Sequence, residues 1–151
     1  MRMKTFFKTH YSYLLIIALG ILYTILLSNN PTGDSFSNAY LSISGKDMFM
    51  PHHLLYSFLG FLFVKAFSFT GISAIKILQM TNVLFACGSL LVIRRMFKRI
   101  HKEEPLICSA ILFCGSCFGF LRFATDNECY IVPLFFTLLT LYYMQTFLIE
   151  N

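Results

Sequence analysis

Five apolar segments follow one another along this chain, and polar stretches separate them. They cover 13–28, 54–69, 75–93, 106–124 and 130–149. A helix needs about 20 predominantly apolar residues, within a range of about 17–25, to cross the hydrocarbon core of a bilayer. The last three segments meet this length, and the first meets it once Tyr11 and Ser12 are counted with it. The pattern predicts an all-α integral membrane protein with a single membrane domain over residues 1–151.

The composition argues against both a soluble domain and a disordered chain. Apolar residues make up 57% of the sequence and charged residues only 13%, whereas a soluble domain is close to half apolar and a quarter charged. Disordered chains are poor in aromatic residues, and this one has 18 Phe and 8 Tyr. The net charge of +5 would suggest nucleic-acid binding in a soluble protein. Here the basic residues flank apolar segments, so we expect no nucleic-acid partner.

The basic residues gather in two short runs, Arg2–Lys8 and Arg94–Lys102. Loops on the cytoplasmic side of a membrane carry an excess of Lys and Arg. Five full crossings would place the two runs on opposite sides, whichever side the N-terminus takes. If 54–69 does not cross fully, both runs and both termini are cytoplasmic. We therefore predict a re-entrant, tilted or interfacial outer helix at 54–69 and about four spans, at 11–28, 75–93, 106–124 and 130–149.

The first segment follows basic residues, as the apolar part of a signal peptide does. The residues after it, Ser28–Pro31, lack the small-x-small pattern of a cleavage site. Further apolar segments also follow. These features favour an uncleaved membrane anchor, and they make the protein multi-pass, in a plasma or inner membrane.

The longest polar stretch, 29–53, would then lie outside. Its first residues, Asn29–Asp34, are dense in turn formers. A short amphipathic helix is predicted over 35–44, and Gly45 and its neighbours end it. The apolar positions of this helix recur at helical spacing: Phe36, Ala39, Tyr40 and Ile43. A loop of this length is usually functional.

Four acidic residues would also lie outside: Asp34, Asp47, Asp126 and Glu128. Asp34 is either a general base or metal ligand at the membrane surface, or the N-cap of the loop helix. Asp126 and Glu128 either polarise a substrate, coordinate a cation or bind a sugar hydroxyl, or simply belong to a polar loop that ends two helices. Arg122 lies four residues before Asp126 and could pair with it. Asp47 is typical of a solvated turn.

Two further groups of polar residues lie near these acids. His52 and His53 are adjacent, so on a helix they would point about 100° apart and seldom share a metal. They suit hydrogen bonds to a phosphate or an ordinary interfacial position, and no metal site is predicted, since further ligands lack the spacing. Lys76, Gln79 and Asn82 recur every three residues on one helix arc. Such an arc serves either interhelical hydrogen bonds or a substrate-phosphate pocket.

The segment Cys114–Cys117 matches the C-x-x-C pattern of redox and metal sites. It lies in the middle of an apolar run without the strand and helix that accompany a redox motif. We interpret it as small residues on a helix face. Gly115 and Gly119 add a small-xxx-small surface that should pack against a neighbouring helix.

Several of these short motifs occur in a recognisable order: Thr32–Ser35, Asn38–Tyr40, Pro51–Tyr56 and Glu128–Tyr130. Their order and spacing resemble the N-terminal region of GT-C glycosyltransferases, in particular the protein O-mannosyltransferase-like family. The resemblance covers roughly residues 10 to 149. The family's double proline is absent, and Pro51–His53 stands in its place. Family members also carry more spans and a terminal outer-face domain.

The resemblance implies transfer of a sugar from a polyprenyl-phosphate donor to an acceptor on the outer face. Asp34 would be the catalytic base. Donor and acceptor would be contacted by substrate-binding residues: His52, His53, Lys76, Asp126 and Glu128. The implied partners are membrane lipid, the lipid-linked sugar donor and other membrane subunits, and a divalent cation is the one cofactor considered.

At this length the chain would be the N-terminal part, or a reduced relative, of such an enzyme. The alternative is a small non-catalytic multi-span protein, such as a subunit or assembly partner, because four spans can hardly enclose a lipid-sugar cavity alone. A carrier is a third hypothesis, and the sequence lacks the paired broken helices expected of one.

Overall fold

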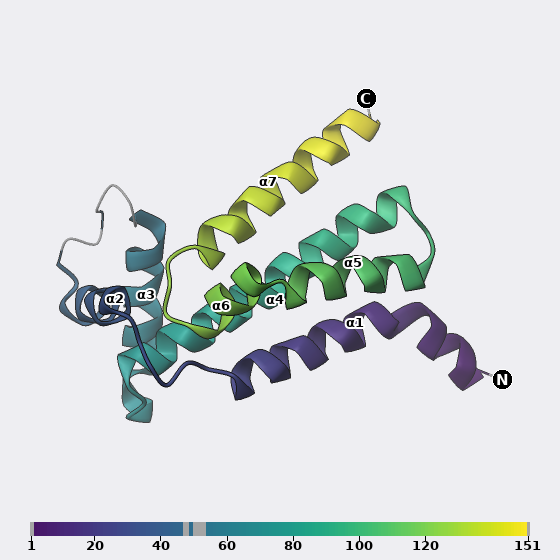
Figure 1. Cartoon of the computed structure of the whole chain (residues 1–151). Helices are drawn as coiled ribbons and strands as arrows, with labels where there is room; N and C mark the ends of the chain where they lie inside the picture. The colour runs from purple at the N-terminus through teal and green to yellow at the C-terminus, as the bar shows by residue number, and fades with distance from the viewer. Residues whose placement is uncertain (1, 47–48, 50–53, 151) are drawn as a thin grey trace.

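The computed structural model describes residues 2–46, 49 and 54–150 (Figure 1). This part of the chain is all-helical, as predicted. Its elements are α1 (Arg2–Ile25), α2 (Gly33–Ser44), α3 (Leu54–Phe67), the 3-10 helix η1 (Ser68–Thr70), α4 (Ala74–Ile100), α5 (Glu104–Ser116), α6 (Phe118–Thr125) and α7 (Ile131–Glu150).

Two of these helices are long and apolar enough to cross a membrane by themselves, α4 and residues 131–149 of α7. The pair α5 and α6 meets the same criterion together, but it bends by 65° at the break between them. The apolar part of α1, His10–Ile25, is shorter, and so is the stretch formed by α3 and η1, Leu55–Thr70. The described residues therefore contain two to three candidate spans, where the sequence predicted about four.

The chain begins and ends at the same end of the helix bundle. Ser12 of α1 contacts Arg94 of α4 and Glu104 of α5, whereas Tyr23 contacts Gly115. Thus α1 runs antiparallel to α4 and parallel to α5. The residues 101–103 that join α4 to α5 and the end of α7 lie at this end too (Figure 1), which we call the terminal end.

The opposite end, which we call the loop end, carries residues 26–32, α2 and residues 126–130. Here α7 begins, and it runs parallel to α4. Phe85 meets Phe135 near the loop end with ring centroids 5.3 Å apart. Arg99 meets Tyr142 near the terminal end, with its guanidinium carbon 4.1 Å from the ring centroid.

The core lies between α1, α4, α5, α6 and the start of α7. Fully buried side chains such as Leu90, Ile107 and Ile131 fill it. Gly115 lets α1 approach α5, because a Cβ at this position would lie 2.8 Å from the Tyr23 hydroxyl and 2.9 Å from Leu19. By contrast, a Cβ at Gly119 would meet no atom within 4 Å. The predicted packing surface is therefore confirmed at Gly115 alone.

The predicted continuous helix over 106–124 is interrupted at Cys117. This residue has extended backbone, with φ −64° and ψ 142°, and it separates α5 from α6. The last carbonyls of a helix lack intrahelical partners, and Tyr23 donates a hydrogen bond to one of them, the Gly115 carbonyl, at 2.7 Å. Cys114 thus lies within α5 and Cys117 at the break that ends it, so the predicted common helix face for the two cysteines is wrong.

Helices α2 and α3 cover the loop end. The Thr32 hydroxyl caps α2 by accepting a hydrogen bond from the Ser35 amide at 3.2 Å, and Gly45 ends the helix in the left-handed conformation, with φ 65°. The predicted loop helix is thus confirmed, two residues longer at its start. α3 packs closely on α2 and α4, since a Cβ at Gly60 would lie 2.6 Å from the Ser42 hydroxyl and 2.8 Å from Leu78.

Candidate functional site

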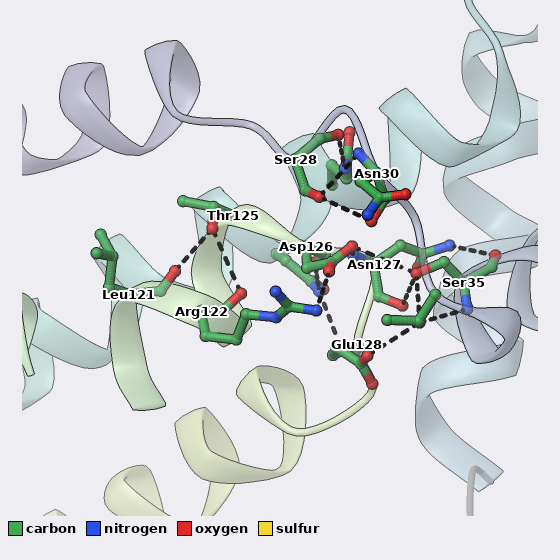
Figure 2. Close-up of polar contacts among 12 residues, drawn as sticks. Ser28, Asn30, Ser35, Leu121, Arg122, Thr125, Asp126, Asn127 and Glu128 are labelled. Carbon is green, nitrogen blue, oxygen red and sulfur yellow. Dashed lines mark hydrogen bonds and ion pairs between the residues drawn. The ribbon is translucent and has the colours of Figure 1, made fainter. Parts of the chain in front are cut away.

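Asn127 lies at the centre of a buried polar cluster at the loop end (Figure 2). Its side-chain amide donates to the Ser35 carbonyl at 2.7 Å and accepts a hydrogen bond from the Tyr56 hydroxyl. Its backbone carbonyl accepts from the Ser35 hydroxyl at 3.3 Å and from Asn38 at 3.4 Å. One residue of the loop between α6 and α7 therefore holds both α2 and α3.

Asp126 is fully buried and already has partners on both carboxylate oxygens. Oδ1 accepts from the Asn127 amide at 2.8 Å and from the Ser35 hydroxyl at 3.3 Å. Oδ2 lies 3.0 Å from Nη2 of Arg122, in an ion pair whose N–H is not aligned as a hydrogen bond. The predicted pairing of Arg122 with Asp126 is confirmed. Because a buried carboxylate needs such partners, this arrangement favours the view of Asp126 as a loop-holding residue.

Glu128 is half-buried and joins the same loop to the start of α2. Its Oε1 accepts a hydrogen bond from the Thr32 hydroxyl at 3.1 Å. Asn82 of α4 fixes the loop from the other side, because its side-chain amide donates to the carbonyls of Asp126 and Glu128, at 2.8 Å each. The position of Glu128 is thus set by α2 and α4 together.

Asp34 is exposed on the first turn of α2. The N-cap alternative for Asp34 is wrong, because Thr32 fills that position. Burial raises the pKa of the Cys129 thiol, and the charges of Glu128 and Asp34 raise it further. Thr32, two residues before Asp34, donates to Glu128, so Glu128 lies beside the first turn of α2, which bears Asp34.

Lys76, Gln79 and Asn82 do face neighbouring segments, as their spacing predicted. The Lys76 ammonium donates to the Ser28 carbonyl at 3.4 Å and to the Asn29 side chain at 3.3 Å. Gln79 donates to the Ser28 carbonyl at 2.9 Å. The arc therefore holds two loops, one after α1 and one before α7. This arrangement supports the interpretation as hydrogen bonds between elements.

The remaining predicted site residues, His52 and His53, lie outside the described residues. Among the residues that are described, no group of three or more His, Cys, Asp or Glu side chains is arranged to hold a metal ion. The Asp126 carboxylate also forms an ion pair with Arg122. The described part of the loop end therefore does not fit a divalent cation.

Four neutral residues that connect these acids were not predicted as site residues: Ser35, Asn38, Tyr56 and Asn127. A signal was nevertheless present in the sequence. Three of them belong to the motifs that carry the family resemblance, and Asn127 lies between the two predicted acids. In a chain this apolar, clustered neutral polar residues indicate a buried hydrogen-bond network.

A second buried polar cluster lies at the terminal end. Arg94 is 3% exposed, and its Nε donates to the Ser12 hydroxyl at 2.6 Å. The same hydroxyl donates to Glu104 Oε2 at 2.7 Å, and Arg94 Nη2 lies 3.4 Å from Glu104 Oε1. The guanidinium also lies over the Tyr13 ring, 3.7 Å from its centroid. This cluster joins α1, α4 and α5. The sequence had instead predicted Arg94 as the first residue of a cytoplasmic basic run that follows a span.

Comparison of the chain with protein-family models, with curated proteins and with solved structures finds no match. The case for a function therefore depends on the residues at the loop end.

Proposed function

We propose that this chain takes part in sugar transfer from a polyprenyl-phosphate donor to an acceptor on the outer face of a membrane, as the N-terminal part, or a reduced relative, of a GT-C glycosyltransferase. One observation carries the proposal. The hydrogen bond of 3.1 Å between Thr32 and Glu128 joins the two acidic motifs of the family resemblance, which lie far apart in the sequence. It places Glu128 beside the turn that bears Asp34.

Asp34 is the group best suited to act as a base. It is exposed, so an acceptor hydroxyl can approach its carboxylate to the roughly 2.6–3.2 Å that proton transfer requires. The acceptor oxygen then forms a bond to the sugar carbon, the bond from that carbon to the lipid phosphate breaks, and the proton passes to Asp34. Glu128 binds a sugar or acceptor hydroxyl with Oε2, the oxygen that Thr32 does not contact. Asp126, buried and paired with Arg122, holds the loop.

Negative charge develops on the lipid phosphate as it leaves, and a nearby cation stabilises it. Lys76 lies in the first turn of α4 at the same end, with its ammonium on the loop after α1. In the proposed reaction it moves from these weak partners to the phosphate. Arg122 is 44% exposed and supplies a second positive charge at this end.

The proposed orientation puts the loop end outside and both termini in the cytoplasm. Support comes from the charge distribution, because both basic runs lie at the terminal end while Asp34, Asp126 and Glu128 lie at the loop end. In this arrangement α1, α4, the bent pair α5–α6 and α7 each cross the bilayer. α3 remains on the outer side. The membrane and the lipid-linked donor are then the direct partners.

The test supplies the chain in proteoliposomes with a panel of polyprenyl-phosphate sugars and a panel of hydroxyl-bearing acceptors, and it measures the release of polyprenyl phosphate. Asp34→Asn should lower the rate about 10²–10⁴-fold, the range lost with a general base, and leave membrane insertion unchanged. Glu103→Gln is the matched control, because Glu103 is an exposed acid at the terminal end, and it should keep full activity. Full activity in Asp34→Asn would remove Asp34 from the mechanism.

A non-catalytic subunit is the second candidate. It is favoured by α7, because only 11% of the apolar stretch of this helix is buried within the described structure. Most of the stretch is thus available to a neighbouring membrane protein or to lipid. In this case no donor of the panel would release its phosphate. Cross-linking from α7 in native membranes would then recover one defined partner.

A further inference from the structure

Helix α2 buries its polar face and exposes its apolar one. The buried residues are Ser35, Asn38, Ala39 and Ser42. The exposed residues include three large apolar side chains, Phe36 at 58%, Tyr40 at 65% and Ile43 at 63%. Spaced at i, i+4 and i+7, they form one stripe along the helix. The orientation is the reverse of that expected for an amphipathic helix on a water-soluble core.

The hydrogen bonds of the polar face account for this orientation. Ser35 and Asn38 both contact Asn127, so the face that bears them must point into the protein. The apolar stripe is thereby turned outward, away from the core. A contiguous exposed apolar surface usually marks an interaction site, and the stripe therefore needs an occupant.

The position of α2 indicates which occupant fits. Figure 1 shows α2 end-on, whereas α1, α4, α5 and α7 run across the view. It therefore lies across α4 and α7, the two described helices long enough by themselves to cross the bilayer, at the end where both begin. A helix in this position lies in the plane of the membrane surface, where an apolar face enters the boundary between headgroups and acyl chains. Tyrosine is also enriched at this depth, as Tyr40 would be.

We propose that Phe36, Tyr40 and Ile43 lie in the interface of one membrane leaflet, with the lipids of that leaflet as their occupant. Lys46, two residues after the end of α2, is exposed and suits the phosphates at the same level. One consequence is that Asp34, two residues before Phe36, is held at the depth of the lipid headgroups. The proposal does not depend on sugar transfer, and its test reads lipid contact alone.

The sequence contains no Trp, so each introduced Trp reports on one position. The probe variant is Tyr40→Trp in vesicles of phosphatidylcholine and phosphatidylglycerol, some with bromine near the headgroup and others with bromine near the chain ends. Leu141→Trp is the deep control, because Leu141 is an exposed residue in the middle of α7. His101→Trp is the aqueous control, since His101 is exposed between α4 and α5.

Tyr40→Trp should lose more fluorescence to the shallow bromines than to the deep ones, and Leu141→Trp should show the opposite order. The emission of Tyr40→Trp should also lie at shorter wavelength than that of His101→Trp, and aqueous iodide should quench it more weakly. Three results would overturn the proposal: quenching like His101→Trp, quenching like Leu141→Trp, or protection from lipid and iodide together, which means a protein partner. If Tyr40→Trp does not fold, Phe36→Trp carries the same expectation.

Discussion

The two ends of the molecule are held together by different kinds of polar contact. At the terminal end, one buried arginine and one glutamate bind each other and the same serine hydroxyl. At the loop end, the neutral side chains of Asn127, Asn82 and Ser35 bind backbone carbonyls. One buried carboxylate, Asp126, belongs to this network and pairs with the exposed Arg122. The other two acids, Asp34 and Glu128, lie at the edge of the network.

The difference has consequences for both stability and function. A buried ion pair is strong only while both partners are present, because removal of one leaves an unpaired charge in a medium of low dielectric constant. In a network of neutral side chains, several weaker hydrogen bonds together hold the segments in place. Such a network also leaves the Asp34 carboxylate exposed. The terminal end is thus expected to be the more sensitive to single substitutions, and the loop end to carry the function.

The largest expected effect is at the terminal end. Glu104→Ala leaves Arg94 buried without its carboxylate, which should lower the free energy of unfolding by about 3–5 kcal/mol. Glu103→Ala removes an exposed neighbour with no such partner among the described residues and should change it little. Unfolding in detergent, followed by circular dichroism, gives both values. Equal stabilities of the two variants would contradict the account of the buried pair.

A double variant sharpens this test. Arg94→Met combined with Glu104→Met removes both charges and fills the space with apolar side chains of similar size. Replacement of a buried ion pair in this way is often neutral or stabilising. The double variant should therefore be more stable than Glu104→Ala. If it were equally unstable, the loss in Glu104→Ala would come from packing rather than from an unpaired charge.

The local features of the fold could be predicted from the sequence. Turn formers and helical spacing placed α2 correctly, and the three-residue recurrence of Lys76, Gln79 and Asn82 placed them on a face that contacts other segments. Each of these predictions depends on residues close together in the chain. The pairing of Arg122 with Asp126 was found for the same reason, since the two lie one helical turn apart.

Contacts between distant segments could not be predicted in this way. Arg94 looks like one member of a basic run, and its burial depends on Ser12, 82 residues earlier. The break at Cys117 likewise depends on Tyr23, 92 residues from the carbonyl that its hydroxyl satisfies. The candidate site was found only in part, because its acids are visible in the sequence whereas the network around Asn127 appears only when α2 and α3 pack against the loop.

A smaller effect is expected at the loop end. Asn127→Ala leaves the Ser35 carbonyl and the Tyr56 hydroxyl without their partner, and an unsatisfied buried group costs about 1–3 kcal/mol. Asn30→Ala is the control, because Asn30 is an exposed asparagine of the nearby loop (Figure 2). The same detergent unfolding measures both. A loss in Asn127→Ala larger than that in Glu104→Ala would reverse the comparison between the two ends.

The smallest expected effect concerns the Cys129 thiol, which can be labelled with a maleimide in a variant whose other cysteines are replaced by serine. The thiolate is the reactive form, and burial together with the charges of Glu128 and Asp34 raises the pKa of this thiol. Labelling should therefore accelerate only at a higher pH than for an ordinary cysteine. Glu128→Gln removes one of the negative charges, so the pKa should fall and the pH profile should move to lower pH.

The control for this shift is Glu103→Gln, which removes a charge at the terminal end and should leave the profile in place. Asn127→Ala separates charge from access. It loosens the loop and leaves both carboxylates in place, so labelling should become faster at every pH, including high pH where the thiol is already ionised. The reduced burial should also lower the midpoint of the profile. If Glu128→Gln also gave a uniform acceleration without a shift, Glu128 would act on Cys129 by holding the loop closed through Thr32. Its carboxylate would then belong to the structural network and not to the accessible pair with Asp34.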